Sequence, residues 1–474
     1  MSNRREAPHV LYVAWGYPPC RAGGVYRALA TANAFAAAGW RVTVLTAERE
    51  AFEKYTGSDP TMEDRIDPAI EVVRLPFFWP HLEADIRGYP WLRVYLPKLW
   101  RRYRNHRDTL AFPEPGYGPW RAVLERAAER IHAKDPVDLV IATANPNVDF
   151  TAAALLHAKH GVPYVMDYRD AWLLDVFDGG MLHEEGSRAA RWEKRLIGAA
   201  REVWFVNEPI RAWHQARYPD RAERMHVVAN GFDPEFAPPA RHHCPEPGQP
   251  LTFGYLGTIT PKVPLAALIA GWRWARGQDG DVRRSRLRLH GYLGYYAGPR
   301  QDLKEMIADA ADTDLAWAGP VGKSEIAGVY ESFDVLLLVL GAGAYVTSGK
   351  VFEYIATGMP IVSVHDPGNA ASDVLRAHPL WFPAADLTPR GIGRAIIAAT
   401  KAALSADDAT RDACRAFAAA YSRALQLAPR VASLTASVGG VPPAAATPAD
   451  QAHPEDQSPP QDQAPSELEP EEAR

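Results

Sequence analysis

The clearest set of residues with chemical potential lies in one short segment, GAGAYVTSGKVFEYIATGMP, at positions 341–360. An apolar run ends here in glycines, and Thr347 or Ser348 can cap the helix that follows. The first turn of such a helix offers unpaired backbone N–H groups to an anion. Lys350 and Glu353 can project from one side of it, the lysine toward a phosphate and the carboxylate toward ribose hydroxyls. The segment predicts a nucleotide-diphosphate site; the alternative is a plain surface ion pair.

A second charged set, Asp167-Tyr168-Arg169-Asp170, directly follows the apolar residues PYVM. Charges at the carboxyl end of a strand in a parallel sheet face the ligand crevice. Asp170 could take a proton from an acceptor hydroxyl or only orient it, and Arg169 could bind a phosphate. The competing interpretation is an Arg–Asp pair that pins the loop.

Other chemically suggestive residues are weaker signals. His183 and His290 stand alone, and lone histidines are more often structural. The sequence Asp312-Thr313-Asp314 has the spacing of a metal-binding motif, but it precedes a short strand and is interpreted as a coincidence. The glycines at 341–343 are followed by no third glycine at 346, as a dinucleotide fingerprint would require. No metal site is therefore expected.

A third feature is IRGYPWLRVYLPKLWRRYRNHR, residues 86–107, which holds seven basic residues and no acidic one. Large apolar and aromatic side chains interleave with the basic ones. This mixture suits the interface of an anionic membrane, where each basic residue contributes about 1 kcal/mol. The alternative is a helix packed on its own domain with a basic face in solvent.

The elements that must position these residues follow a strand–helix rhythm. Strands of the first half are expected at 9–14, 41–46, 70–75, 138–143, 163–167, 202–206 and 225–229. Strands of the second half are expected at 251–256, 287–291, 314–319, 334–340, 360–364 and 379–382. Nearly continuous apolar strands separated by helices imply parallel sheets covered on both faces. The fold class is therefore α/β, with two tandem Rossmann-like, doubly wound domains and a ligand crevice between them.

The expected domain boundaries follow shifts in composition. Residues 1–235 form a first domain and 236–408 a second. Residues 409–436 form a terminal helix that can pack back on the first domain. Residues 437–474 hold eight prolines and eight acidic residues against one basic residue, which predicts a disordered tail.

Composition excludes several classes of protein. The chain has 474 residues, 47% of them hydrophobic and 23% charged, which fits a globular protein of two or three domains. Its three cysteines are far apart, so neither a disulfide framework nor a zinc cluster is expected. Without the acidic tail the body is nearly neutral, which argues against nucleic acid as a partner. The N-terminus reads as a strand and no apolar stretch would span a bilayer, so a cytoplasmic protein is expected, at most peripheral at the inner face of the plasma membrane.

The segment 341–360 resembles the donor-site motif of the retaining GT-B glycosyltransferases of family four. Further stretches follow in that family's order over roughly residues 8–430: GGVYRALATANAFAAAGWRVTVLTA, DLVIATANPNVDFTAAALLHAKHGVPYVMDYRDAW, NGFD, FGYLGTITPK, LRLHGYLG and WAGPVGKSEIAGVYESFDVLLLVL. The second stretch is similar to one typical of the subfamily that builds exopolysaccharides and other glycoconjugates of the cell envelope. No single stretch is decisive, but the ordered set is specific.

The resemblance implies a role for each matching residue. Glu353 would hold the donor ribose, Lys350 would lie at the diphosphate, and Lys262 would neutralise the leaving group. Gly23 and Gly24 would bring backbone N–H groups from the opposite wall. The positions carried over to the donor site are Gly23, Gly24, Thr258, Lys262, Gly291, Ser348, Gly349, Lys350 and Glu353; those assigned to catalysis are Arg169, Asp170 and Lys262.

Two positions depart from the family's pattern. The family motif has two glutamates with seven residues between them, and the first would fall at Tyr345, which cannot act as a carboxylate. The arginine that often accompanies the family's lysine is absent from GTITPK, where Thr258 or Thr260 takes its place. The contact to the donor sugar therefore differs from that of the family.

The function implied is transfer of a sugar, with retention, from a nucleotide-diphosphate sugar to a glycan or lipid-linked acceptor, with no metal or other cofactor. Catalysis would depend on cations and N–H groups aimed at the leaving diphosphate. One alternative is a nucleotide-sugar epimerase of the same layout, which would need an acid–base pair near the sugar. The other is a catalytically silent scaffold that binds a nucleotide or a partner.

Overall fold

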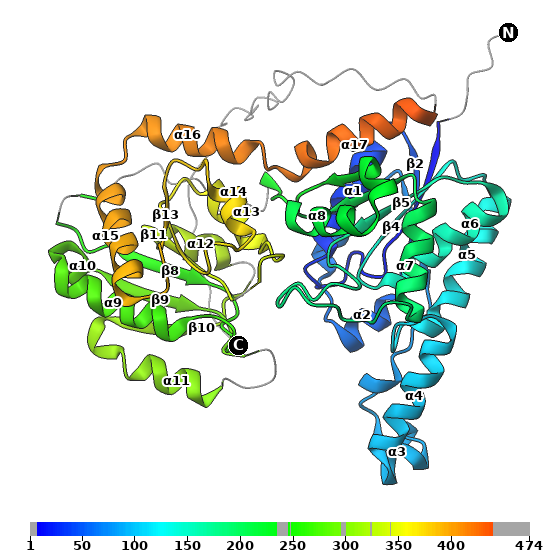
Figure 1. The fold of residues 1–474 in the computed structure, drawn as a ribbon, viewed down its shortest axis with the longest axis horizontal. Helices are drawn as coiled ribbons and strands as arrows, with labels where there is room; N and C mark the ends of the chain where they lie inside the picture. Colours follow the sequence, from blue (N-terminus) through cyan, green and yellow to red (C-terminus); the bar gives the residue numbers. More distant parts are fainter. Residues whose placement is uncertain are drawn as a thin grey trace, which may run out of the picture.

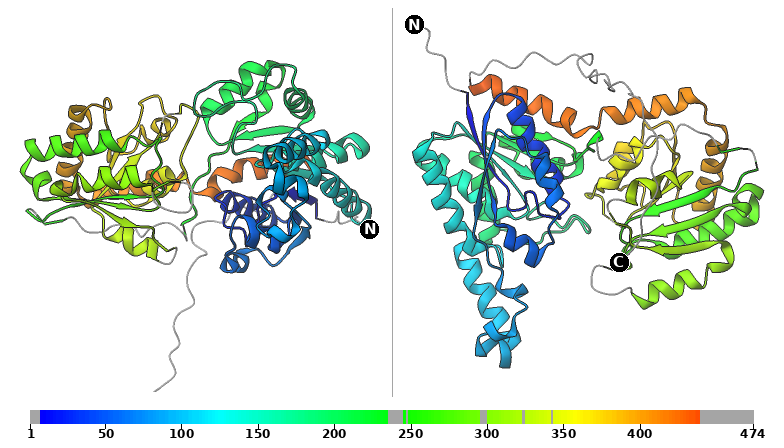
Figure 2. Two further views of the ribbon diagram at one scale, coloured as in Figure 1. Left: turned by 90° about the horizontal axis from the view of Figure 1, so that it is seen from below. Right: turned by 180° about the vertical axis from the view of Figure 1, so that it is seen from behind.

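The structure is a computed structural model that describes residues 7–234, 245–246, 248–294, 300–322, 325–341 and 343–438. Two parallel β-sheets, one of seven strands and one of six, each carry helices on their faces (Figure 1). Each sheet belongs to its own half of the chain. The molecule therefore has two doubly wound α/β domains side by side (Figure 2).

The first sheet has the strand order β3-β2-β1-β4-β5-β6-β7, with every neighbouring pair parallel. Its strands are β1 (His9–Val13), β2 (Arg41–Ala47), β3 (Ile70–Leu75), β4 (Leu139–Thr143), β5 (Tyr164–Tyr168), β6 (Glu202–Phe205) and β7 (Met225–Val227). Its main flanking helices are α1 (Val25–Ala37), α2 (Arg49–Tyr55), α5 (Arg121–Lys134), α6 (Phe150–His160), α7 (Arg188–Ala199) and α8 (Glu208–Arg217). The central strands are buried along their whole length because helices cover both faces.

The second sheet has the order β10-β9-β8-β11-β12-β13. Its strands are β8 (Thr252–Leu256), β9 (Arg286–His290), β10 (Leu315–Gly319), β11 (Val335–Val339), β12 (Ile361–Val364) and β13 (Trp381–Pro383). Its helices are α9 (Leu265–Gln278), α10 (Gly280–Arg284), α11 (Gln301–Ala308), α12 (Ile326–Glu331), α13 (Gly349–Ala356), α14 (Ala371–Leu375) and α15 (Pro389–Ser405). In both sheets the strand order reverses beside the first strand, so each sheet has one topological switch point, between β1 and β4 and between β8 and β11.

The chain crosses between the domains twice. It leaves the first domain after β7 and returns through α16 (Asp408–Ala419) and α17 (Arg423–Val438) (Figure 1). The two passages touch: Phe232 N–H donates to Tyr421 O at 3.1 Å, and Arg423 N–H donates to Phe232 O at 2.8 Å. The terminal helix expected at 409–436 is therefore two helices, joined at this crossing.

Helix α17 packs on α1 of the first domain. Leu427, Val431 and Leu434 belong to the core of that domain, and Leu434 is fully buried. The indole of Trp40 donates to Thr435 Oγ1 at 2.8 Å. The last helix thus completes the core that the first helix begins.

One element leaves the body of the first domain: the hairpin, residues 86–111, made of η3 (Ile86–Gly88), α3 (Trp91–Tyr95) and α4 (Pro97–Ala111). It projects away from both sheets (Figures 1 and 2). Large apolar side chains along it are exposed, among them Trp91 at 69% and Tyr95 at 76%. The expectation of a helix packed on its own domain is wrong for these side chains.

The sequence predicted the fold class correctly. A strand forms at each of the thirteen predicted positions, with ends shifted by one or two residues, and both sheets are parallel as expected. The predicted junction at 235–236 lies outside the described residues, as does the predicted tail beyond residue 438.

Candidate functional site

The carboxyl ends of the two sheets meet through a small set of contacts. Asn207, which caps α8 of the first domain, donates through Nδ2 to Tyr345 O at 2.8 Å and to Thr347 Oγ1 at 3.1 Å. The ammonium of Lys262 lies 3.8 Å from the ring centroid of Phe177. The residues that bridge the two domains therefore come from the loops after β5, β6, β8 and β11, where ligands of such folds bind.

The donor loop, residues 341–348, leads from β11 into α13. Ser348 is the N-cap of α13, and its hydroxyl accepts from Lys350 N–H at 3.4 Å. Asn369 fixes the start of the loop by donating through Nδ2 to Gly343 O at 3.0 Å. Gly349 is exposed at the first turn. Of the two predicted caps, Ser348 caps the helix, while Thr347 is buried and accepts the bond from Asn207.

Lys350 extends from α13 toward the carboxyl end of β8. Its ammonium donates to the Tyr255 hydroxyl at 3.1 Å and lies 4.5 Å from the centre of that ring. Burial lowers the pKa of Lys350 to about 8, against the opposing effect of the Glu353 carboxylate. A partly desolvated lysine without a bonded carboxylate gains most from an anionic ligand.

Two glycines make room beside this ammonium. A Cβ at Gly257 would lie 1.7 Å from Lys350 Nζ, and a Cβ at Gly291 would lie 2.1 Å from Gly257 O. Both have positive φ, +152° and +123°. The adjacent Thr258 accepts the Tyr255 hydroxyl through its backbone oxygen at 3.0 Å. The ends of β8 and β9 thus present bare backbone next to a cation, as a phosphate site requires.

Glu353 lies one turn further along α13 and is exposed. Its Oε2 accepts the Tyr330 hydroxyl at 3.1 Å. A carboxylate has about four acceptor positions, so one bond to a phenol leaves most of its capacity for ligand hydroxyls.

Lys262 lies on the loop after β8, and its side chain is exposed except for its contact with Phe177. Its backbone lies against the donor loop, since a Cβ at Gly341 would be 2.8 Å from Lys262 O. The structure thus places Lys262 at the switch point of the second sheet, facing the first domain.

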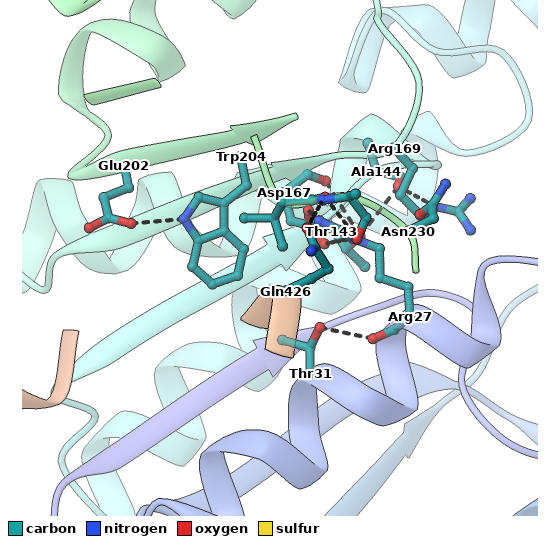
Figure 3. A network of polar contacts seen from close by, with 12 residues as sticks. Arg27, Thr31, Thr143, Ala144, Asp167, Arg169, Glu202, Trp204, Asn230 and Gln426 are labelled. Carbon is teal, nitrogen blue, oxygen red and sulfur yellow. Dashed lines mark hydrogen bonds and ion pairs between the residues drawn. The ribbon is translucent and has the colours of Figure 1, made fainter. Parts of the chain in front are cut away.

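On the first-domain wall, Arg169 and Asp170 follow β5. Arg169 donates through Nε to Ala144 O at 2.7 Å, and its guanidinium covers Gly24, where a Cβ would lie 1.2 Å from Nη1 (Figure 3). Asp170 is exposed and accepts from Asn145 Nδ2 at 3.0 Å. No residue lies within 4 Å of a Cβ built on Gly23. The loop is therefore pinned by separate contacts of Arg169 and Asp170, not by a pair between them.

Asp167 does not face the crevice, contrary to the sequence interpretation of the charged set after PYVM. It is completely buried and ion-paired with Arg27 of α1, with Oδ1 2.6 Å from Nη2 (Figure 3). Arg27 also donates through Nη1 to Val228 O at 2.9 Å and Ala229 O at 3.2 Å. Asp167 lies on β5, an interior strand of the sheet, and its side chain points toward α1. The pair ties α1, β5 and the first crossing together.

Two more buried carboxyl groups lie beside the switch point of the first sheet. Asp149 accepts Trp15 N–H through Oδ2 at 2.7 Å, while its Oδ1 has no partner in the described structure. Glu114 accepts from the backbone of Asn147 at 3.0 Å and Val148 at 2.9 Å. Burial raises the pKa of Asp149 well above its usual range, and burial likewise raises that of Glu114. Sequence reasoning passed over both because they sit among apolar residues.

The weaker candidates take structural positions. His290 packs on Phe333 with 5.6 Å between ring centres, and burial lowers its pKa, as it does for His183. Asp312 and Asp314 lie before β10, at the amino end of the strand, paired with Arg273 and Arg288. Within the described ranges no cluster of three or more His, Cys, Asp or Glu residues could hold a metal ion.

Sequence reasoning missed Asn207, Gly257 and Arg27. Asn207 directly follows a strand and precedes Glu208-Pro209, a pattern typical of a helix cap, which was a signal that could have found it. The contacts of Gly257 with Lys350 and of Arg27 with Asp167 join residues 93 and 140 positions apart, so no local pattern marks them.

Residues 22–231 match the family model described as Glycosyl transferase 4-like domain. This stretch runs from the loop before α1 to the first crossing. A comparison with curated protein sequences gives no significant match.

Solved structures resemble the whole chain. A glycosyltransferase from Rickettsia africae superposes with a TM-score of 0.60 at 12% identity, over 91% of this chain and 98% of that one. A trehalose 6-phosphate synthase from Burkholderia multivorans gives 0.57 at 13% identity, over 91% and 99%. A putative UDP-N-acetylglucosamine 2-epimerase from Listeria monocytogenes gives 0.53 at 10% identity, over 91% and 97%.

The likeness to these structures establishes the two-domain fold called GT-B. Together with the domain match over residues 22–231, it supports a GT-B glycosyltransferase.

Proposed function

We propose that the protein transfers a sugar from a nucleotide-diphosphate sugar to a glycan or lipid-linked acceptor, with retention of configuration and without a metal. The observation that carries the proposal is the position of Lys350: a half-desolvated ammonium beside the bare backbone of Gly257, at the start of α13. An anionic diphosphate would satisfy this cation and the free N–H groups of the helix together.

The donor half of the reaction follows from these residues. Negative charge develops on the leaving diphosphate, so the rate depends on donors already aimed at it. Lys350 and the N–H groups after Ser348 supply that stabilisation, and Lys262 adds a second cation from the loop after β8. Glu353 takes the ribose hydroxyls. Tyr345, which contacts Gly179 of the first domain, stands where the resemblance expects a carboxylate, so it would touch the sugar through its ring or hydroxyl.

The acceptor half belongs to the first-domain wall. Asp170 would orient the acceptor hydroxyl and Arg169 would bind a phosphate of donor or acceptor. Attack from the face of the leaving group retains the configuration and requires no covalent nucleophile. Closing the two domains on the donor would exclude water and limit hydrolysis.

The hairpin suits a peripheral membrane contact and hence an acceptor carried by a lipid, as in synthesis of cell-envelope glycoconjugates. Leu99, Tyr103 and Leu110 share one exposed face of α4, being four and eleven residues apart. On the hairpin, the exposed cations that have no ion pair among the described residues are Lys98, Arg101, Arg102 and Arg107. Arg104 is instead paired with Asp108 at 2.9 Å and Arg93 packs on Tyr89 at 3.6 Å, so these two hold the hairpin together. No helix in the described ranges is long and apolar enough to cross a bilayer.

The experiment is a thermal-shift screen with nucleotide sugars, followed by incubation of the stabilising one, radiolabelled, with a membrane extract. A ligand that binds only the native state must raise the Tm. Transfer of label to lipid or glycan supports the proposal. Release of a free epimer would favour the epimerase, whose fold the chain shares, and a Tm shift without turnover would favour the silent scaffold.

A further inference from the structure

The first domain has a groove at the base of the hairpin, with a cavity volume of about 470 Å³, to which the proposed reaction assigns no role. Its walls come from α2, from the residues after β3, from α4 and from the start of α5. The walls are mostly aromatic and apolar: Tyr55, Phe77, Phe78, Trp120 and Val123 line it.

Both cations at the groove are already paired with carboxylates, and its other charged residues, Glu48 and Glu50, are acidic. Lys54 is paired with Glu83 at 2.6 Å, and Arg104 with Asp108 at 2.9 Å. Glu48 accepts Phe77 N–H at 3.2 Å. Because these cations are already paired, the groove should bind an anion only weakly. Its apolar walls favour a hydrocarbon chain.

The groove lies between two places that matter for the proposed reaction. On its outer side, Phe78 is 57% exposed and Arg104 belongs to the hairpin helix, so the groove opens onto the apolar and basic surface of the hairpin. On its inner side, Phe77 packs edge-on against Trp15 at 5.3 Å, and Trp15 donates its N–H to Asp149 at the switch point.

We infer that this groove binds the hydrocarbon chain of a lipid-linked acceptor next to its anionic headgroup. The inference deepens the proposed function and depends on it for the identity of the acceptor. Four unpaired cations on the hairpin attract an anionic membrane surface, and the groove lies between that surface and the switch point of the first sheet. The chain lies against Phe78 and Trp120, and its headgroup points to the crevice.

The test uses the full chain in solution, without vesicles, and two ten-carbon probes below their micelle concentrations: geranyl phosphate and decyl phosphate, with inorganic phosphate as the headgroup alone. Calorimetry should show saturable binding of the hydrocarbon probes and none of phosphate. Preference for geranyl over decyl phosphate indicates an isoprenoid chain, and the reverse indicates an acyl chain. Absence of saturable binding of both would overturn the inference.

Two variants locate the binding. Val123→Trp fills the groove from the half-buried face of α5 and should weaken binding at least tenfold, while the matched control Val227→Trp, on the exposed edge strand β7, should leave it unchanged. Phe78→Asp changes an exposed side chain, so the fold survives, and should weaken binding similarly. Equal binding by wild type and all three variants would contradict the inference. It would also be contradicted if the protein were a dimer in solution and Val123→Trp dissociated it, because the groove would then be covered by a second copy of the chain.

A fourth variant separates this site from the membrane contact and from sugar transfer. Reversing Lys98, Arg101, Arg102 and Arg107 to Glu should release the protein from vesicles of anionic phospholipid but leave geranyl phosphate binding intact. Loss of both would place the chain on the hairpin surface instead of in the groove. None of these measurements involves a nucleotide sugar. Binding of the hydrocarbon probes can therefore be judged even if the protein fails to transfer a sugar.

Discussion

Two pairs of oppositely charged residues, Arg27 with Asp167 and Lys350 with Glu353, differ sharply in the structure. The first pair is wholly buried, and Arg27 bonds both carboxylate oxygens and two carbonyls. In the second, the ammonium bonds a phenol and the carboxylate accepts from a phenol, each with capacity to spare. Charges that the chain satisfies completely hold the fold, whereas charges it satisfies in part are available to a ligand. The predictions below test this division.

The largest effect is expected from Arg27→Met. Removing the guanidinium leaves Asp167 buried without a counter-ion and frees two carbonyls at the crossing. The free energy of unfolding should fall by about 3–5 kcal/mol, measured by urea denaturation. The control is the double variant Arg27→Met with Asp167→Leu, which should recover much of the loss. A single variant as stable as wild type would show that the pair does not hold the domain.

Lys350→Met should leave stability intact or raise it, since the lysine is desolvated without a bonded carboxylate. The rate of sugar transfer should instead fall by about 10²–10³, the usual cost of one missing donor at a developing negative charge.

Wild-type affinity for the nucleotide should also decline above pH 8. Burial sets the pKa of Lys350 to about 8 in the free protein, and a bound diphosphate must raise it. Above pH 8 the free protein has lost this proton, so binding the nucleotide requires taking it up again. A calorimetric titration between pH 7 and 10 checks this slope, which Lys350→Met should abolish.

Glu193 provides a buried carboxyl whose bonds come from neutral groups. Tyr218 and Tyr168 donate to it at 2.9 Å and 3.2 Å, and burial raises its pKa from 4.5 to about 7. The folded state therefore holds the proton longer than the unfolded state, and this contribution to stability is complete below pH 4.5 and lost as the pH rises through 7. Relative to Glu193→Gln, wild type should lose about 1–3 kcal/mol across that window. A constant difference in denaturation midpoints from pH 4.5 to 8 would contradict the prediction.

Glu353→Ala should have the smallest effect. Its carboxylate is exposed, so the Tm of the free protein should stay within about 1–2 °C of wild type. The affinity for a nucleotide sugar should fall about tenfold, the value of one charge-assisted hydrogen bond. Glu331→Ala, on the neighbouring α12, is a matched control that should bind normally. Unchanged affinity in Glu353→Ala would remove the ribose role and weaken the distinction drawn here.

The sequence predicted both sheets because their central strands are short apolar runs bounded by glycine, proline or charge, and this signal is local. It also predicted the helix that begins at Gly349 and its cap Ser348, because the signals for this helix start lie within a few residues of Lys350. It failed for Asp167, because the residue that keeps this carboxylate buried, Arg27, lies 140 positions earlier in the chain and no local pattern marks the pair. For the hairpin the sequence left two interpretations open, because an amphipathic pattern does not say whether its apolar face is covered; the exposed side chains there agree with the membrane-interface interpretation.

The return of α17 has a consequence for synthesis of the protein. Leu427, Val431 and Leu434 close the core of the first domain, yet they are among the last described residues of the chain. When the ribosome has made all seven strands of the first sheet, the surface of α1 that these side chains later cover is still exposed to water. The first domain can therefore reach full stability only after the second has been translated, and chaperones would meet an exposed apolar strip on it until then.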